Sequence, residues 1–426
     1  MVGRRSAYQK IIVVACLVLL AFVQACGASR GAARPRAKRH FLAWESANAH
    51  DSLRPWRKTK RPEREYDVRA RRSTRMKKPS FWNTKPVQFS TPVVFDNRVF
   101  VGSNAGMFYA IDILPNAKRW WVQTEGGIES KAAAADGAVY VGDVKGYAYS
   151  FDTDTGAINW KVPLGNELLG APLVVGRVVY FNTLDGRLFA LDANAGMELW
   201  HTDAMERLVG FTVRRQSSPI HYNGKIIFGT SRGTLVAYSV DGTLAWVRLL
   251  GNPRAQVMDV DSKPVIIADK LYAASADGML YCLDPTIGEI LWGIPAGGAN
   301  DLLYHDGVLF ASGGGILSAV DPITGAKFWE QNLDTPGISS PAGGKGYIAV
   351  VSTEDKLYLV DQYNGDIVFE RYIRRGSFGD PFILGDELFV VANTSRLFSF
   401  IIHEKEKKIK KKKEKEEEKE SVVSSQ

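Results

Sequence analysis

Residues 271–293 read LYAASADGMLYCLDPTIGEILWG. Two short runs rich in apolar side chains flank a tight turn at Gly278, which is the sequence signal of a β-hairpin. An acidic turn, residues 284–288, follows the hairpin and leads into a further run that carries Trp292. The stretch therefore predicts three consecutive antiparallel strands, the third of which is aromatic.

The same unit recurs along the whole middle of the chain. In the eight units, the residue after the second strand is Asp112, Asp152, Asp192, Ser239, Asp284, Asp321, Asp361 and Ile401. The spacings between these residues are 40, 40, 47, 45, 37, 40 and 40. An aromatic strand follows most units, marked by Trp121, Trp160, Trp200, Trp246, Trp292, Trp329 and Phe369. A period near 40 residues, built from short strands, is typical of a β-propeller.

The eighth unit has no aromatic strand of its own, because a Lys/Glu-rich tail begins there. Phe81 and Trp82 precede the first unit, and we expect them to supply the missing strand. Residues 80–402 number 323, about 40 for each of eight blades. We therefore predict an all-β fold, an eight-bladed β-propeller whose ring is closed by an N-terminal strand. Such closure leaves no long sheet edge unpaired.

These units resemble the repeats of the quinoprotein (PQQ-like) propellers, which carry the same tryptophan and the same D-x-x-T-G turn. WD40 repeats are a poorer match, because the units have no Trp-Asp ending and no Gly-His start. The resemblance covers nearly all of residues 80–402 and implies the fold. It does not by itself imply a function, since this fold hosts both enzymes and scaffolds.

Composition divides the chain into four segments. Residues 1–26 form an apolar leader, 27–79 an Arg-rich linker that we expect to be disordered, 80–402 the propeller, and 403–426 a low-complexity Lys/Glu-rich tail. The net charge of +8 is uneven, because the linker holds 17 basic and five acidic residues whereas residues 80–400 hold 25 basic and 34 acidic ones. The acidic body argues against a nucleic-acid-binding ring.

The leader has the features of an export signal. Basic residues precede an apolar run, 11–23, that is too short to span a bilayer as a helix. The sequence VQACG that ends at Gly27 resembles the lipobox of bacterial lipoproteins, in which the cysteine, here Cys26, is acylated and becomes the N-terminus. By the same resemblance, Gly27 in place of Asp implies retention at the outer membrane. The alternative is an ordinary signal peptide with a chance cysteine.

The propeller carries no recognisable catalytic motif. Quinoprotein dehydrogenases use a vicinal disulfide and a calcium ion, but this chain has no adjacent cysteines, and we interpret Cys282 as a small buried hydrophobe. The aspartates that recur every 40 positions are interpreted as turn residues that bond local amides. None of the six histidines has metal-pair spacing, and no serine elbow or H-E-x-x-H occurs. We expect no cofactor, no metal and no catalysis.

Two spacings between units are long, 47 and 45 residues. They lengthen the connection between the third and fourth units, 201–216, and the connection between the fourth and fifth units, 247–262. We expect the connections of adjacent blades to stand beside each other on one rim. Loops on a rigid scaffold are the usual place for binding, so this rim is the predicted partner-binding surface.

The leader, the ring and these two connections together resemble the BamB family, the propeller lipoproteins of the outer-membrane β-barrel assembly machine. In that family an apolar-x-apolar-Arg stretch before a Ser-x-Pro, and an Asp-x-Asp before a Pro, contact the central assembly protein. Phe211, Val213 and Arg214 match the first pattern, and Asp259 and Asp261 match the second. The alternative is that the two aspartates only cap a turn.

The resemblance implies a non-catalytic scaffold held at the periplasmic face of the outer membrane. Its implied partners are the POTRA domains of the central assembly protein, the other assembly lipoproteins, unfolded barrel precursors, and the membrane through the lipid on Cys26. Two alternatives stay open. One is a periplasmic propeller that binds PQQ or carbohydrate and could be a redox enzyme. The other is an envelope lipoprotein whose basic arm binds anionic polymers.

Overall fold

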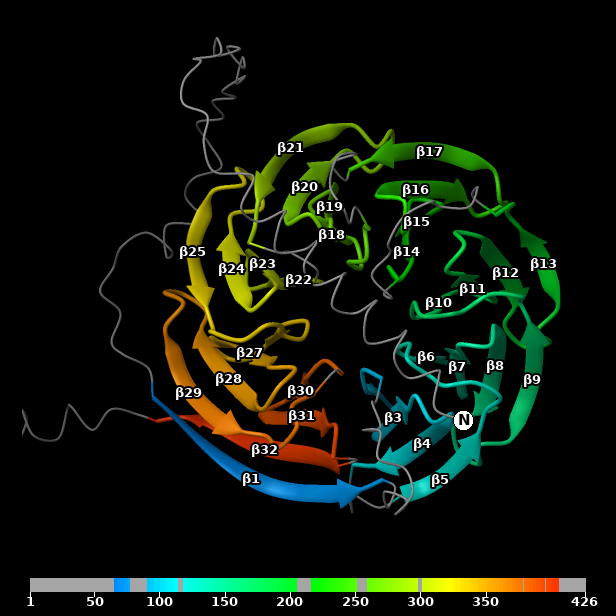
Figure 1. The fold of residues 1–426 in the computed structure, drawn as a ribbon. Coiled ribbons are helices and arrows are strands. Elements are labelled where there is room, and N and C mark those ends of the chain that lie inside the picture. The colour runs from blue at the N-terminus through cyan, green and yellow to red at the C-terminus, as the bar shows by residue number, and fades with distance from the viewer. Residues whose placement is uncertain are drawn as a thin grey trace, which may run out of the picture. The chain divides into compact units, whose positions relative to one another are not determined.

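A computed structural model describes residues 65–76, 90–113, 118–204, 216–250, 259–297, 301–377, 379–394 and 396–405. They belong to one compact unit, Pro55–Gln426, and their strands form eight four-stranded antiparallel sheets. Figure 1 shows these sheets as the blades of a ring. The predicted eight-bladed β-propeller is confirmed. Among the described residues, no helix has the length and apolar character needed to cross a bilayer.

Each blade places four strands in order from the centre of the ring outward, and consecutive strands pair in seven of the eight. Blades 1 to 4 consist of β2 (Val93–Phe95), β3 (Arg98–Gly102), β4 (Met107–Asp112), β5 (Lys118–Gln123); β6 (Ala133–Ala135), β7 (Ala138–Gly142), β8 (Tyr147–Asp152), β9 (Ile158–Pro163); β10 (Leu173–Val175), β11 (Val178–Asn182), β12 (Leu188–Asp192), β13 (Glu198–His201); and β14 (Ile220–Tyr222), β15 (Lys225–Gly229), β16 (Thr234–Ser239), β17 (Leu244–Leu249). Blades 5 to 7 consist of β18 (Val265–Ile267), β19 (Lys270–Ala274), β20 (Met279–Leu283), β21 (Ile290–Pro295); β22 (Asp301–His305), β23 (Val308–Gly313), β24 (Ile316–Val320), β25 (Lys327–Asn332); and β26 (Ala342–Gly343), β27 (Tyr347–Val351), β28 (Lys356–Asp361), β29 (Ile367–Tyr372). Blade 8 consists of β30 (Phe382–Leu384), β31 (Glu387–Ala392), β32 (Arg396–Glu404) and β1 (Tyr66–Arg75).

The two middle strands of a blade are buried on both faces. In β7 and β8, for example, almost every residue is buried, whereas the outer strand β9 is mostly exposed. Neighbouring blades cover both faces of the middle strands, which is why these strands read as continuous apolar runs. The core is correspondingly divided into eight hydrophobic clusters, one at each junction between blades.

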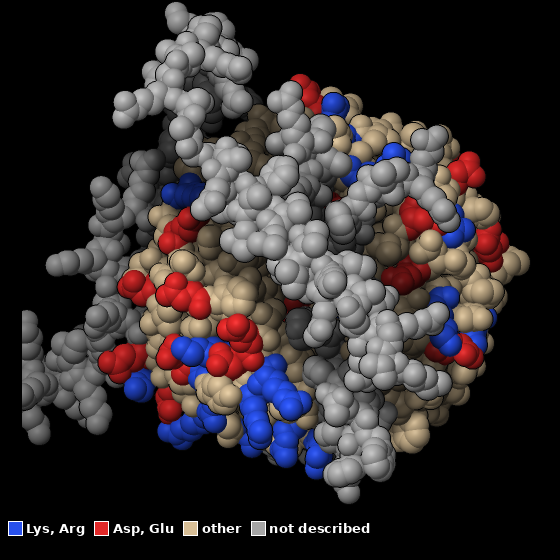
Figure 2. Space-filling view, in the orientation of Figure 1, with Lys and Arg blue, Asp and Glu red and all other residues tan. Residues whose placement is uncertain are grey.

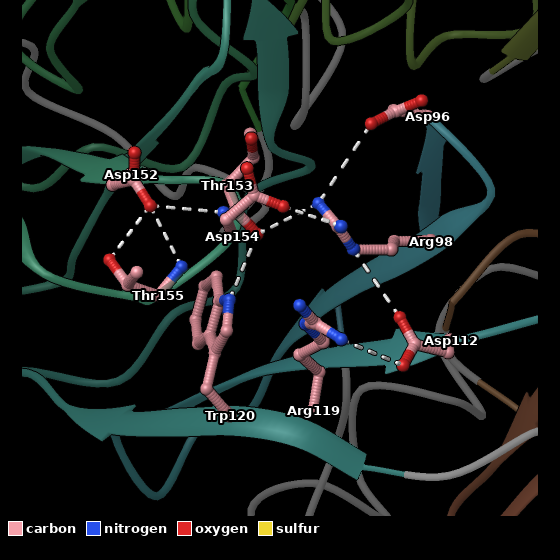
Figure 3. Close-up of polar contacts among 9 residues, drawn as sticks. All are labelled: Asp96, Arg98, Asp112, Arg119, Trp120, Asp152, Thr153, Asp154 and Thr155. Atoms are coloured by element: carbon pink, nitrogen blue, oxygen red, sulfur yellow. Dashed lines mark hydrogen bonds and ion pairs between the residues drawn. The ribbon is translucent and has the colours of Figure 1, made fainter.

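A tryptophan on the outer strand links most blades to the next one. Trp120 on β5 donates through Nε1 to the carbonyl oxygen of Thr153, 2.9 Å away in the turn after β8 (Figure 3). The corresponding bonds are Trp160 to Ala193, Trp200 to Val240, Trp246 to Pro285 and Trp329 to Gln362. The assignment of Trp121 to this position is wrong, since Trp121 is 58% exposed and Trp120 is buried. Two adjacent tryptophans on an outer strand cannot be told apart from the sequence pattern alone.

The aspartates that recur in the repeats hold local turns. Oδ1 of Asp152 accepts hydrogen bonds from the Thr155 hydroxyl at 2.7 Å and from the Thr155 amide at 2.8 Å (Figure 3). These two bonds hold the pKa of Asp152 below its ordinary value. Carboxylates at Asp192, Asp284, Asp321 and Asp361 accept equivalent amide bonds. The interpretation of these residues as turn residues is confirmed.

The strand that closes the ring is β1, which pairs with β32 from Tyr66↔Glu404 to Arg75↔Arg396. An N-terminal closing strand is therefore confirmed, but its predicted position is wrong. β1 lies inside the segment interpreted as a linker, and Phe81 and Trp82 lie outside the described residues. As an outer strand, β1 needs few apolar side chains and can carry many arginines. The pattern of apolar and aromatic residues that marks the other strands is therefore missing from its sequence. The ring thus begins at Tyr66 rather than at residue 80.

Candidate partner-binding face

The two lengthened connections run from β13 to β14 and from β17 to β18. They occupy residues 202–219 and 250–264, whereas the connection between β5 and β6 occupies only 124–132. Each leaves the outer strand of one blade and enters the inner strand of the next, so both lie on the same face of the ring. Residues 205–215 and 251–258 lie outside the described residues. The described ends of both connections show how they are held.

A hydrogen bond joins the two connections directly. The hydroxyl of Ser217 donates to the carbonyl oxygen of Ser262 at 2.7 Å, and both residues are buried. Ser262 in turn bonds its own blade, because its hydroxyl donates to the carbonyl oxygen of Ala274 and accepts from the Ala274 amide. The two connections therefore lie side by side where they enter their inner strands, as the long spacings of adjacent units predict.

The end of the first connection is also held against blade 3. Oε1 of Gln216 accepts hydrogen bonds from the amides of Leu169 at 2.9 Å and Gly170 at 3.1 Å. Nδ2 of the Asn182 side chain donates to the carbonyl oxygen of Ser217 at 2.8 Å. Sequence reasoning did not single out Gln216, and its position directly after Arg214 and Arg215 is the only sequence signal that could have pointed to it. A fourth bond runs from the backbone amide of Ala171 to the Ser218 hydroxyl at 3.0 Å, so the last residues before β14 are fixed by four bonds that involve side chains.

Asp259 and Val260 are closely packed between blades 4 and 5. Asp259 is 1% exposed, and its carbonyl oxygen accepts a hydrogen bond from the amide of Ala276 at 2.7 Å. The amide of Val260 donates to the carbonyl oxygen of Thr230 at 3.1 Å, and the Val260 side chain fills the space beside Gly229. A Cβ at Gly229 would lie 2.1 Å from the Val260 carbonyl oxygen, so only glycine fits there.

The same backbone arrangement recurs in other blades. The carbonyl oxygens of Gly127 and Glu167 accept from Val144 and Leu184, as that of Asp259 does from Ala276. The backbone of Asp259 therefore has a structural role common to the repeats. Asp261, two residues on, is partly exposed and is the more accessible of the two predicted contact residues. Cys26, Phe211, Val213 and Arg214 lie outside the described residues.

Two chemical features of the described residues bear on the sequence predictions. No group of three or more His, Cys, Asp or Glu side chains among them is placed to hold a metal ion. Cys282 is 2% exposed, and burial raises the pKa of its thiol, which is the opposite of what an activated nucleophile needs. The interpretation of Cys282 as a buried hydrophobe is confirmed.

A known family matches most of the ring, from blade 2 to blade 8. The family model described as outer membrane protein assembly factor BamB matches residues 123–314 and 313–408. The chain belongs to the BamB family. BamB of Kangiella koreensis is 30% identical over 191 residues, which cover 43% of this chain and 49% of that protein. BamB of Shewanella oneidensis is 28% identical over 200 residues, 45% of this chain and 51% of that protein. The chain thus spans about half the length of these BamB relatives.

Solved structures show the same fold. BamB from Moraxella catarrhalis is similar with a TM-score of 0.68 at 21% identity, over 79% of this chain and 100% of that chain. A europium-containing methanol dehydrogenase is similar with a TM-score of 0.66 at 14% identity, over 78% of this chain and 93% of that chain. A BamB protein and a dehydrogenase share this architecture, so the function of this BamB-family chain must be argued from its own residues.

Proposed function

We propose that this BamB-family protein is a non-catalytic scaffold in the assembly of outer-membrane β-barrel proteins. The observation that carries the proposal is the bond between Ser217 and Ser262, which sets two lengthened connections side by side on one face of the ring. We propose that this face binds the POTRA domains of the central assembly protein. Other assembly lipoproteins and unfolded barrel precursors are the further proposed partners.

The proposed contact residues have the chemistry of a compact binding site. Phe211, Val213 and Arg214 combine two apolar side chains with an arginine, and aromatic and arginine side chains dominate the binding energy of many interfaces. Asp261 offers a partly exposed carboxylate to a cation of the partner. The fixed ends of the connections support binding, because less conformational freedom is then lost when a partner docks.

The test is binding of residues 55–426 to the POTRA domains of the assembly protein from the same organism. This segment is the compact unit that contains all eight sheets. We expect micromolar or tighter binding, and a loss of about tenfold or more in affinity for Arg214→Glu. Arg177→Glu is the matched control, because Arg177 is exposed beside the turn between β10 and β11, on the opposite face.

The aspartates are tested by the same measurement. Asp261→Asn removes a charge without changing the side-chain shape, and Asp136→Asn does so in the turn between β6 and β7 on the opposite face. We expect only Asp261→Asn to weaken binding. Unchanged affinity in both Arg214→Glu and Asp261→Asn would remove these connections as the contact site. A folded ring that does not bind POTRA domains at all would overturn the scaffold proposal itself.

The membrane anchor is a separate part of the proposal. Acylation of Cys26 with several chains would hold the protein stably at the periplasmic face of the outer membrane, which a single chain would not. In cells labelled with a fatty acid, we expect the label on the full chain and its loss in Cys26→Ser. Equal labelling of the two proteins would contradict the assignment of Cys26.

A further inference from the structure

Two arginines stand opposite each other where the ring closes. Arg75 is the last residue of β1 and Arg396 the first of β32, and the two are register partners. Both are exposed, and Nη1 of Arg396 donates to the hydroxyl of Ser73 at 3.0 Å. Like charges directly opposite each other destabilise a sheet. The pair is therefore not explained by the stability of blade 8.

The turn after β29 brings two more arginines to the same place. Arg374 and Arg375 are both exposed on this turn, and Nδ2 of Asn393 donates to the carbonyl oxygen of Arg375 at 2.8 Å. Asn393 belongs to the turn between β31 and β32, which ends at Arg396. Arg375 has a φ of 66°, a region that favours glycine and asparagine over a long side chain. The chain thus holds a guanidinium here at a backbone cost.

These four residues, Arg75, Arg374, Arg375 and Arg396, are termed the arginine cluster. Within the part of the chain that the structure describes, none of them forms an ion pair, although Arg98 and Arg187 do so elsewhere in the ring. Glu354 lies in the neighbouring turn of blade 7 and is likewise not paired with them. Figure 2 shows blue side chains gathered in the lower part of the view, over the region where Figure 1 places the ends of β29, β31 and β1.

We propose that the arginine cluster docks the ring onto anionic lipid headgroups, with lipid phosphates as its ligands. Guanidinium groups match phosphate oxygens with two parallel hydrogen bonds each, and four of them on one surface can engage several phosphates at once. The exposed aromatic side chain nearest in sequence is Tyr372, which is 66% exposed, and tyrosine is enriched at membrane interfaces.

A membrane surface fits the cluster better than a protein partner does. The fully buried centre of a protein interface is depleted in charged residues and rich in apolar ones. Here the cluster supplies four charges. Among the described residues of blade 8 and of the turn before it, Leu384 at the end of β30 is the one large exposed hydrophobic residue, and Tyr372 ends β29 just before that turn. A plane of phosphates, in contrast, gains attraction from each arginine near it.

The cluster lies on the same face as the two lengthened connections. Both the turn after β29 and those connections lead from an outer strand to the inner strand of the next blade. Lipid docking would therefore turn the proposed partner-binding face toward the membrane. The inference does not rest on partner binding, because it follows from blade 8 and from the turn that precedes it.

Flotation with lipid vesicles tests the proposal. Residues 55–426 are mixed with vesicles of phosphatidylcholine alone or of phosphatidylcholine with phosphatidylglycerol, and bound protein is measured after centrifugation. We expect binding to the anionic vesicles only, weakening as salt is raised. The double variant Arg374→Glu/Arg375→Glu should lower the partition coefficient by about tenfold or more, since each basic residue contributes to lipid attraction.

The matched control is Arg177→Glu/Lys225→Glu, which makes the same change of net charge beside turns on the opposite face. This control should float like the unchanged protein, and both double variants should keep the β-sheet circular dichroism of the ring. Inorganic phosphate, added at equal ionic strength, distinguishes a site for single phosphates from a site for a surface of headgroups. Free phosphate would compete with vesicle binding only at a site for single phosphates. Equal flotation of the two double variants, no binding to anionic vesicles, or full competition by free phosphate would each overturn the proposal.

Discussion

The indole ring of Trp160 lies directly against Gly196 of the next blade. A Cβ at Gly196 would approach the ring to 2.7 Å, and the φ of Gly196 is +68°. The same contact recurs at five other junctions, between Trp120 and Gly156, Trp200 and Gly242, Trp246 and Gly288, Trp292 and Gly325, and Trp329 and Gly365. The glycine of the D-x-x-x-G turn is therefore needed twice, for its backbone conformation and for the space that the tryptophan fills.

Replacement of this glycine should loosen the junction between two blades. We expect Gly196→Ala to lower the stability of residues 55–426 by about 2–4 kcal/mol, because a left-handed backbone and an overpacked contact both cost free energy. Gly176→Ala is the control, since Gly176 has a φ of +59° but nothing within 4 Å of a Cβ. Its cost should be about 1–2 kcal/mol. Denaturant unfolding measures the stability of both variants. Equal losses would show that the Trp160 indole moves aside to make room for the added Cβ.

Much of this fold could be predicted from the sequence, because the same pattern of residues recurs in eight units, each of which must pack as a blade. Continuous apolar runs, a turn glycine and an acidic turn recur because each blade is packed between two others. The strand at Tyr66–Arg75 could not be found in this way. As an outer strand it is mostly open to solvent, so arginines are tolerated at the exposed positions 69, 71 and 75.

The candidate face could be predicted only in part. Irregular spacing identifies where connections are long, and it correctly places two of them beside each other. Which side chains fix those connections depends on contacts between residues far apart in sequence. Gln216 bonds the amide of Leu169, 47 positions away, and no local pattern encodes that bond. The burial of Asp259 likewise follows from packing between two blades.

Loss of the bond between the two connections should weaken partner binding. Ser217→Ala removes the donor to Ser262, so a buried carbonyl oxygen loses its hydrogen bond at a cost of about 1–2 kcal/mol in stability. We also expect affinity for the POTRA domains to fall about threefold to tenfold, because the connections are then less fixed. Ser312→Ala breaks a comparable buried bond, to Ser339, at another junction.

The two serine variants should therefore lose similar stability and differ in binding. Denaturant midpoints measure the stability of the two variants, and titration calorimetry measures their affinity for the POTRA domains. If Ser312→Ala weakened POTRA binding as much as Ser217→Ala, the effect would reflect the ring as a whole rather than the two connections.

The loss of folding stability at low pH should depend on the turn aspartates. The pKa of Asp152 is held low by the Thr155 hydroxyl and then by the Thr155 amide. A carboxyl with a lowered pKa in the folded state stabilises above its unfolded pKa, and this contribution is lost as pH falls through the folded value. Thr155→Val should raise the pKa of Asp152 toward its ordinary value. The pKa of Asp192, lowered mainly by the Ala195 amide, should stay unchanged. Carboxyl titration by NMR distinguishes the two, and an unmoved Asp152 would refute the hydroxyl as a cause.

The buried thiol gives a direct test of how tightly blades 5 and 6 pack. Cys282 is the single cysteine of residues 55–426 and belongs to the hydrophobic cluster between these blades. Because burial both shields the thiol and raises its pKa, a thiol reagent should modify it about 100-fold more slowly in the folded ring than in denaturant. Asn194→Cys adds a thiol on an exposed turn and gives the fast reference in the folded state. If Cys282 reacted as fast as that reference, the junction would open readily, and the thiol would have to be considered again as a reactive group.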